Sequence, residues 1–375
     1  MWLAAFLAGF YAVPVAAANV THSTVLYKQF FPAWDGMLKD YLETDCKKNF
    51  TNYLNVSFED THVSYSVLDC LLKQFPEFRK AELGAAAVVL GLAPTILQMI
   101  SPTPADTALI SVRRPILALL LGMASPASVF SPATSYAESL ETLSKPLSRQ
   151  LRASFPYTTA RLLGGSRRAR HGYITGSLSV LQYVLALAAV ANSAYRTYQL
   201  CVWTVCSFSP ITVFLPALWH GTVVLVHLGG WIALRLNSQS AKITKGAREE
   251  PHWQSMATGW QCRLKALLFN ETMPSALAKR LPINSREAGP APFFSVVTSA
   301  LYVGVPVHVL FGTLVLSSLM FISAFDSIAV VAWYALSTIV ANAIVYFEYA
   351  GIQAAASEDL ENTAEGQQMI EYSAL

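Results

Sequence analysis

The fold of this chain is decided by residues 83–130, which read LGAAAVVLGLAPTILQMISPTPADTALISVRRPILALLLGMASPASVF. The first apolar run, residues 83–100, is long enough to cross a bilayer, for which about 20 apolar residues are needed. A second apolar run follows the break at residues 101–106 and carries Arg113 and Arg114. Whether this second run also crosses decides on which side of the membrane every later loop lies.

The composition indicates an integral membrane protein. Of the 375 residues, 54% are hydrophobic and only 13% are charged, whereas about a quarter of the residues are charged in an ordinary soluble domain. The net charge of +3 is small, and the basic residues lie beside apolar segments instead of forming an isolated arm. This distribution favours membrane topology over nucleic-acid binding, so the lipid bilayer is the expected partner and nucleic acid is not.

Residues 1–18 have the pattern of a cleavable signal peptide. An apolar stretch ends at Pro14, and Ala16 and Ala18 form an A-x-A cleavage arrangement, although no basic residue precedes the stretch. We expect cleavage after Ala18, with an uncleaved anchor as the alternative. Residues 19–80 then form a small lumenal or extracellular domain.

Three N-x-S/T sequons fall within residues 19–80, and they begin at Asn19, Asn49 and Asn55. Such sequons accept glycans on the surface of secreted domains. Their position in the segment that we expect to be exported therefore predicts a glycoprotein. A further sequon at Asn270 faces the cytosol in the topology that the charges favour, and we expect it to carry no sugar.

Helical spacing of apolar residues within 34–42 and 67–75 predicts two amphipathic helices in this domain. Cys46 follows the first helix and Cys70 lies in the second. In an oxidising compartment, a disulfide between them would staple a domain too small to build a deep core; the alternative is that both are reduced and buried. The chain has five cysteines without a C-x-x-C pair, which argues against a zinc or iron–sulfur site.

Basic residues set the topology, because short cytoplasmic loops are enriched in Lys and Arg. Two segments are rich in them, residues 101–172 and residues 237–292. The basic residues of the first are Arg113, Arg114, Lys145, Arg149, Arg152, Arg161, Arg167, Arg168 and Arg170, and those of the second are Lys242, Lys245, Arg248, Arg263, Lys265, Lys279, Arg280 and Arg286. Both segments are cytoplasmic only if residues 108–130 do not cross, so we expect a re-entrant or interfacial helix there.

The remaining apolar runs complete an all-α helical transmembrane bundle with about five crossings, the N-terminus outside and the C-terminus inside. The later spans are predicted at residues 173–195, 210–236, 294–325 and 327–350, with the last two joined at Asp326. The expected order is a signal peptide (1–18), a lumenal or extracellular domain (19–80), the first span with the re-entrant or interfacial segment (83–130), a basic cytoplasmic loop (131–172), the second and third spans (173–236), a second basic cytoplasmic loop (237–292), the fourth and fifth spans (294–350) and an acidic cytoplasmic tail (351–375).

Both cytoplasmic loops contain a basic amphipathic segment, at residues 140–155 and 253–267. Helices of this kind commonly lie in the plane of the lipid headgroups. Anionic headgroups are therefore expected partners of the loops, and a partner protein is the alternative.

The tail at residues 351–375 is acidic and lacks apolar periodicity, which predicts a flexible segment. Its last four residues, YSAL, are similar to Tyr-x-x-Φ sorting signals, which adaptor proteins bind as extended peptides. A sorting adaptor that contacts Tyr372 and Leu375 is thus a candidate partner.

Polar side chains inside the spans are the candidate functional residues, because such groups are costly in hydrocarbon. They are His220, His227, His308 and Asn342. A haem between His227 and His308 is less well supported than neutral imidazoles that hydrogen-bond neighbouring helices. Glu348 lies at the predicted cytoplasmic end of its span, where its side chain is expected to reach the interface. No catalytic motif is present, so we predict no catalytic residues, metal or cofactor.

The segment LGLAPTIL at residues 90–97, with ALISVRRP at 108–115 and LALL at 117–120, resembles uncharacterised multi-pass membrane proteins of filamentous fungi. The resemblance is confined to about residues 70–130, with weak extension into the later spans. It implies the architecture and the class of organism, and it supplies neither an activity nor site residues.

The sequence therefore favours a non-enzymatic membrane glycoprotein that serves binding, sensing or scaffolding. The expected location is the secretory pathway or the plasma membrane, with the vacuole or endosome as alternatives. The competing hypothesis is a transporter or accessory protein of a fungal small-molecule pathway. Its polar path would be formed by His220, His227, His308 and Asn342.

Overall fold

The computed structural model describes residues 25–55, 61–136, 171–240, 271 and 292–373. In these parts the chain is almost entirely helical. The elements are α3 (Asp35–Glu43), α4 (Lys47–Asn55), α5 (Thr61–Gln74), α6 (Glu77–Ile100), α7 (Pro104–Ser111), α8 (Pro115–Ala124), α12 (His171–Val202), β1 (Val205–Cys206), α13 (Leu215–Ser240), α15 (Pro292–Ser317), β2 (Leu319–Met320) and α16 (Ala324–Ser373).

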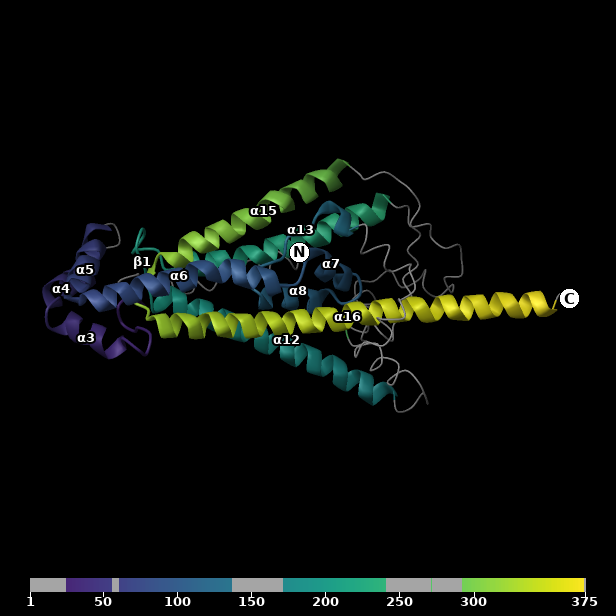
Figure 1. Cartoon of the computed structure of the whole chain (residues 1–375), viewed down its shortest axis with the longest axis horizontal. Helices are drawn as coiled ribbons and strands as arrows, with labels where there is room; N and C mark the ends of the chain where they lie inside the picture. The colour runs from purple at the N-terminus through teal and green to yellow at the C-terminus, as the bar shows by residue number, and fades with distance from the viewer. Residues whose placement is uncertain (1–24, 56–60, 137–170, 241–270, 272–291, 374–375) are drawn as a thin grey trace. The chain divides into compact units, whose positions relative to one another are not determined.

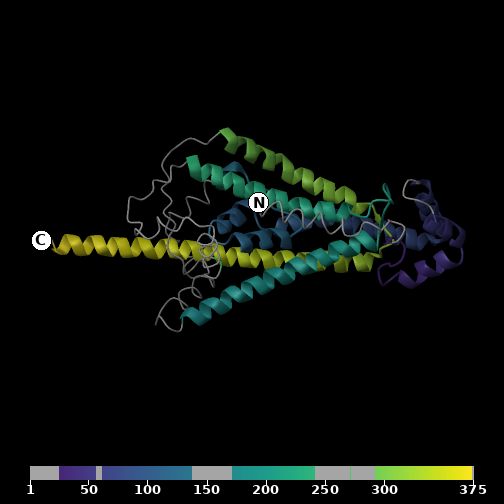
Figure 2. The same cartoon turned by 180° about the vertical axis from the view of Figure 1, so that it is seen from behind.

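Five of the described helices are long and apolar enough to cross a membrane (Figures 1 and 2). This agrees with the predicted number of crossings and makes the chain a multi-pass membrane protein. The candidate spans are Glu77–Ile100, Gly176–Val202, Leu215–Leu236, Phe293–Ser317 and Ala324–Ile352.

The chain forms two compact units. Unit 1 comprises Met1–Ala93, Tyr195–Leu218 and Gly312–Val331, and unit 2 comprises Pro94–Ala194, Trp219–Phe311 and Ala332–Leu375. Each of the five long helices has one end in each unit. The described helices α3, α4 and α5 belong to unit 1, whereas α7 and α8 belong to unit 2.

The link between the last two spans lies at residues 318–323, and the predicted junction at Asp326 was wrong. The Ser323 hydroxyl accepts a hydrogen bond from the Asp326 backbone N–H at 3.0 Å and donates one to the Asp326 carboxylate at 2.9 Å. Ser323 thus caps the N-terminal end of α16, which begins at Ala324, before Asp326. Asp326, whose low hydropathy indicated a loop, is thus part of the first turn of α16.

Other helix ends also differ from the predicted ones. α6 begins at Glu77, directly after Pro76, and its charged first turns contain an ion pair between Arg79 and Glu82 at 2.7 Å. α12 continues past Tyr195 to Val202, and α13 begins only at Leu215. α6 and α12 extend beyond their apolar runs because local side-chain pairing and the absence of a helix breaker stabilise the additional turns.

α16 continues without a break to Ser373 (Figure 2), where the sequence predicted a flexible tail. Residues 353–373 are rich in Ala, Glu and Gln, contain no proline and have one glycine, Gly366. These are strong helix formers, so local propensity extends the helix without an apolar face.

The second apolar run forms two short helices, α7 and α8, which pack on each other. Thr103 caps α7 by accepting from the Asp106 N–H at 3.0 Å, and Pro104 follows at the first helical position. Burial raises the pKa of the Asp106 carboxyl, and a hydrogen bond from the Thr103 hydroxyl opposes this shift. The ten residues of α8 extend about 15 Å, half of a hydrocarbon core.

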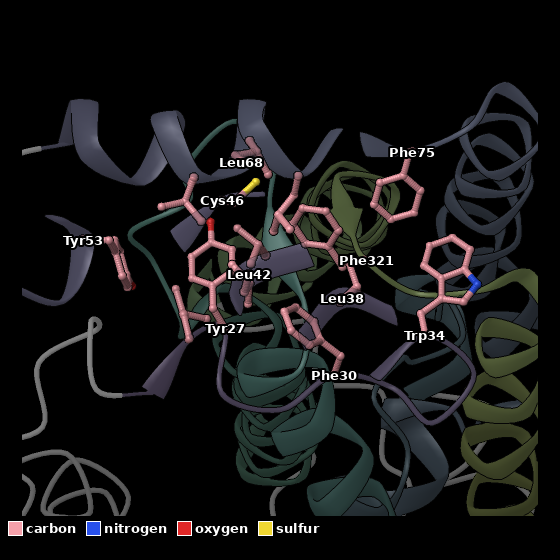
Figure 3. Packing of buried hydrophobic residues seen from close by; sticks show 14 of the residues in the cluster. Tyr27, Phe30, Trp34, Leu38, Leu42, Cys46, Tyr53, Leu68, Phe75 and Phe321 are labelled. Atoms are coloured by element: carbon pink, nitrogen blue, oxygen red, sulfur yellow. The ribbon is translucent and has the colours of Figure 1, made fainter. Parts of the chain in front are cut away.

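Unit 1 is built around an aromatic core (Figure 3). The ring of Phe321 is fully buried, and its centroid lies 6.0 Å from that of Phe30 and 6.1 Å from that of Phe75. Val205 of β1 belongs to the same core. The two strands pair antiparallel, with Val205 opposite Met320. The short links after α12 and after α15 therefore complete the core of the N-terminal domain, which we define as residues 25–75.

A disulfide joins Cys46 to Cys70, with their Cα atoms 5.9 Å apart, as the sequence predicted. The bond connects the segment between α3 and α4 to α5. The described residues of this domain form three helices, where the sequence predicted two. The additional helix, α4, buries only Tyr53 in the core, so its apolar periodicity was too weak to indicate it.

Substituting Ala for Phe321 removes the ring that joins the link before α16 to the N-terminal domain. We expect a loss of about 3–5 kcal/mol in the free energy of unfolding, the usual result of truncating a buried phenylalanine. Denaturant titration in detergent micelles measures it. Phe325→Ala is the matched control, because that ring is 77% exposed. Equal effects of the two substitutions would contradict the role of Phe321.

Candidate functional site: the buried helix α8 and its polar caps

α8 lies at the centre of unit 2. Its buried residues Leu117, Ala118, Leu121 and Ala124 form one core with residues of two candidate spans. Those residues are Ala186 and Ala189 of α12 and Ala341, Ile344 and Val345 of α16. The alanines of α12 allow the close approach that helices make in a membrane bundle. A helix in such a position has both ends among other helices and needs polar partners there.

Glu271 caps the N-terminal end of α8. One carboxylate oxygen accepts from the backbone N–H of Ile116 at 2.7 Å, and the other accepts from the Tyr183 hydroxyl of α12. The first N–H groups of a helix have no partner within the helix, and an anion there is also favoured by the helix dipole. Glu271 is 5% exposed, so this cap is shielded from water.

Arg114 directly precedes α8 and forms a fully buried ion pair with Glu348 of α16, at 2.8 Å. The same guanidinium donates to Gln182 at 2.6 Å and to Ser179 at 2.7 Å, both on α12. Gln182 in turn donates to the Glu348 carboxylate at 2.7 Å. We call Arg114, Ser179, Gln182 and Glu348 the arginine cluster.

The expectation that Glu348 reaches the membrane interface was therefore wrong, because both side chains of the pair have no exposed surface. Removing an ion from water costs several kcal/mol, and only a close counter-ion with further hydrogen bonds offsets this. Gln182 and Ser179 supply those hydrogen bonds. One donor, Nε of Arg114, has no partner among the described residues.

The C-terminal end of α8 is capped by three side chains from three spans. The Met123 carbonyl lies 3.1 Å from Nε2 of His220, the Ala124 carbonyl accepts from the Ser193 hydroxyl at 2.6 Å, and the Pro126 carbonyl lies 3.0 Å from Nε2 of His308. A carbonyl oxygen only accepts, so Nε2 carries the proton in both histidines. These residues satisfy the carbonyls that a helix end leaves without partners.

His227 packs against α8 from α13. A Cβ at Gly122 would lie 3.0 Å from the His227 ring, so a larger residue would require the ring to shift by a few tenths of an ångström. Nδ1 of His227 lies 2.8 Å from the Thr107 hydroxyl, which is 3.2 Å from the Thr103 carbonyl. Because the hydroxyl donates to that carbonyl, it accepts from Nδ1–H. Nε2 of His227 then carries a free lone pair and has no partner among the described residues.

The structure brings three of the four predicted intramembrane polar residues to α8. The fourth, Asn342 of α16, is exposed, and among the described residues its side chain forms no hydrogen bond with the histidines. His308 also contacts the Thr222 hydroxyl at 2.9 Å, so both of its ring nitrogens are engaged. Within the described residues, no group of three or more His, Cys, Asp or Glu side chains is arranged as a metal site.

The predicted glycosylation residues differ in their surroundings. Asn55, the last residue of α4, is exposed. Asn49 lies within α4, and its amide donates to the Ser66 carbonyl at 3.2 Å. Tyr372 falls in the last turn of α16. Asn19, Leu375, the signal segment 1–18 and the amphipathic segments 140–155 and 253–267 lie outside the described residues.

Four residues of the site escaped sequence reasoning: the capping residues Ser193 and Glu271, and Ser179 and Gln182 of the arginine cluster. Ser and Gln within a span carry a weak signal because they are tolerated in many packing roles. Glu271 falls in residues 237–292, which the sequence predicted as a basic loop, and one acidic residue there carries little signal. The one usable signal was the charge of Arg114 beside an apolar helix, because a buried cation requires an anion somewhere in the chain.

Comparison of the chain with protein-family models, with curated proteins and with solved structures finds no match. The chemistry of the site therefore rests on its own geometry. Most of the polar side chains described above hydrogen-bond to the ends of α8 or to Arg114. Their arrangement therefore positions α8 among the spans.

Substituting Gln for Glu348 keeps the shape of the side chain and removes the charge that neutralises Arg114. We expect a loss of about 3–5 kcal/mol in the free energy of unfolding, because the guanidinium then lies buried without a counter-ion. The double variant Arg114→Met/Glu348→Met should recover most of this loss, since no charge remains buried. Titration with SDS in mixed micelles compares both variants with the wild-type chain.

The control for this comparison is Glu77→Gln on α6. Glu77 pairs with Lys80 at 2.8 Å, but its side chain is 89% exposed, and exposed pairs contribute little to stability. A Glu348→Gln variant as stable as this control would show that the buried pair is not ionised.

Proposed function

We propose that this chain is a non-enzymatic membrane glycoprotein of the secretory pathway or plasma membrane that binds or scaffolds a partner protein through its N-terminal domain. The carrying observation is that this domain and the two short links share one hydrophobic core, through Phe321 and Val205. The shared core holds the domain against the ends of its helices, so the domain is not attached through a flexible linker alone. Rigid placement favours a binding platform, because little conformational freedom is lost on association.

A position of unit 1 at a membrane–water interface is supported by its exposed aromatic residues. Unit 1 contains one end of every candidate span, and aromatic side chains are exposed near these ends. They are Phe78, Tyr195, Tyr198, Phe208, Phe214 and Phe325. Aromatic residues, tyrosine and tryptophan above all, gather at membrane–water interfaces. The sequons and the disulfide of the same unit fit an exported, oxidising side.

The re-entrant placement of α7 and α8 is part of this proposal. The C-terminal end of α6, both short helices and the N-terminal end of α12 all belong to unit 2. The segment between the first two spans thus starts and finishes in the same unit. Together with the basic residues of the loop that follows, this supports entry and exit on the cytoplasmic side.

A second candidate function, transport of a small molecule or an accessory role in such a pathway, is favoured by one observation. Nε2 of His227 is an unpaired acceptor on a side chain that is only 7% exposed. Buried polar groups without partners are uncommon and point to a proton donor that visits the site. Asn342 does not contribute to this path, because it faces away from the bundle.

Glycan mapping tests the topology. Sequons inserted after Phe130 and after Arg170 should stay unmodified, because both positions are cytoplasmic in this proposal. Asn55 should carry a glycan at higher occupancy than Asn49, because Asn49 lies within α4 and its side-chain amide donates a hydrogen bond to the Ser66 carbonyl. Gel mobility before and after endoglycosidase treatment gives the result, with Asn55→Gln as the control. Modification at either inserted sequon would overturn the five-crossing arrangement.

Cross-linking distinguishes the two candidate functions. A membrane-impermeant amine-reactive reagent on intact cells should join the exposed Lys47, Lys48 and Lys73 to a partner protein. The adduct should disappear in the triple Lys→Arg variant and in Phe321→Ala, and persist in His227→Ala.

The second candidate function predicts the opposite pattern in the same cells. There the lysines give no specific adduct, whereas His227→Ala and His308→Ala change uptake or efflux of a small molecule. Unchanged transport in both histidine variants would remove this candidate.

A further inference from the structure

Asn342 is an exposed amide in the middle of a candidate span. It lies in the span Ala324–Ile352 of α16, more than two helical turns from either end. The described amide side chains within the spans are Gln98, Gln182, Asn192, Gln199 and Asn342, and only the last is exposed. Asn192, for comparison, donates to the Ser337 hydroxyl at 2.7 Å.

The Asn342 amide has no hydrogen-bond partner among the described residues. Lipid chains cannot supply one, and a polar group without a partner is costly in hydrocarbon. An amide that faces outward from the bundle and has no partner among the described residues therefore favours a partner beyond them.

The surface around Asn342 has the spacing of a helix-pairing seam. Ala332, Ala335, Ile339, Asn342 and Tyr346 follow one another at intervals of three and four residues, and all are exposed or partly exposed. This spacing keeps one face toward a second helix in a left-handed pair, and the alanines permit close approach. We call these five residues the α16 seam.

The outward face of α15 shows what a face toward lipid looks like in this protein. Its exposed residues at similar spacing are Val303, Val307, Leu310 and Leu314, which are all apolar. The amide is thus what distinguishes the α16 seam from a surface built only for lipid.

We propose that the α16 seam pairs with the same seam of a second copy of this chain, and that the two Asn342 amides hydrogen-bond to each other. An asparagine amide both donates and accepts, so it is complementary to itself. Two copies inserted in the same orientation present Asn342 at the same depth, and a two-fold axis along the membrane normal brings the amides together. Any other helix would need a polar group at that particular depth.

Cysteine cross-linking of the full chain in native membranes tests the pairing. In a Cys201→Ser/Cys206→Ser/Cys262→Ser background, Ile339→Cys should form a disulfide-linked dimer on oxidation. Leu310→Cys on α15 is the matched control, since it is 67% exposed on an apolar face, and it should not. Adding Asn342→Leu should lower the dimerisation constant about 3- to 30-fold, the range for one interhelical polar contact in a membrane. Asn342→Gln should keep the dimer.

Subunit counting by single-molecule photobleaching in dilute proteoliposomes gives an independent reading of the same variants. The wild-type chain should appear as a dimer and Asn342→Leu as a folded monomer. Equal cross-linking at residues 310 and 339, an undiminished dimer in Asn342→Leu, or cross-links from residue 339 only to the N-terminal segment or to another protein would each overturn the proposal.

Discussion

A helix that begins and ends among other helices must find partners there for its terminal N–H groups and carbonyls. This constraint accounts for most of the polar side chains around α8. Glu271 serves the N-terminal end, and Ser193, His220 and His308 serve the C-terminal end. Residues that look functional because they are polar inside a span are here required by the backbone of their neighbour.

The same constraint explains the arginine cluster. Pro115 begins α8, and the guanidinium of Arg114, directly before it, lies buried between α12 and α16. An arginine in that position is tolerable only with a carboxylate in contact, and Glu348 of α16 provides it. The ion pair lies at the N-terminal end of this short helix, and the histidine contacts lie at its C-terminal end.

Hydropathy was sufficient to predict the five spans, and the positions of the cysteines were sufficient to predict the Cys46–Cys70 bridge. They fail where a pairing joins distant parts of the chain, as between Arg114 and Glu348, because no local pattern in one sequence reports a contact between residues 234 positions apart. They also misplace helix ends such as that at Ser323, where two capping hydrogen bonds outweigh the apolar character of the segment. The sequence indicated Asn342 as a polar residue within a span, but its outward orientation depends on how the helices pack.

Phe321 and Val205 have a further consequence for synthesis of the chain. The N-terminal domain emerges first, but its core lacks these two residues until the segments after the second and fourth spans have been made. Until then, apolar surface around Phe30 and Phe75 stays open to solvent. A truncated or stalled chain thus presents the kind of exposed apolar patch that chaperones bind during folding.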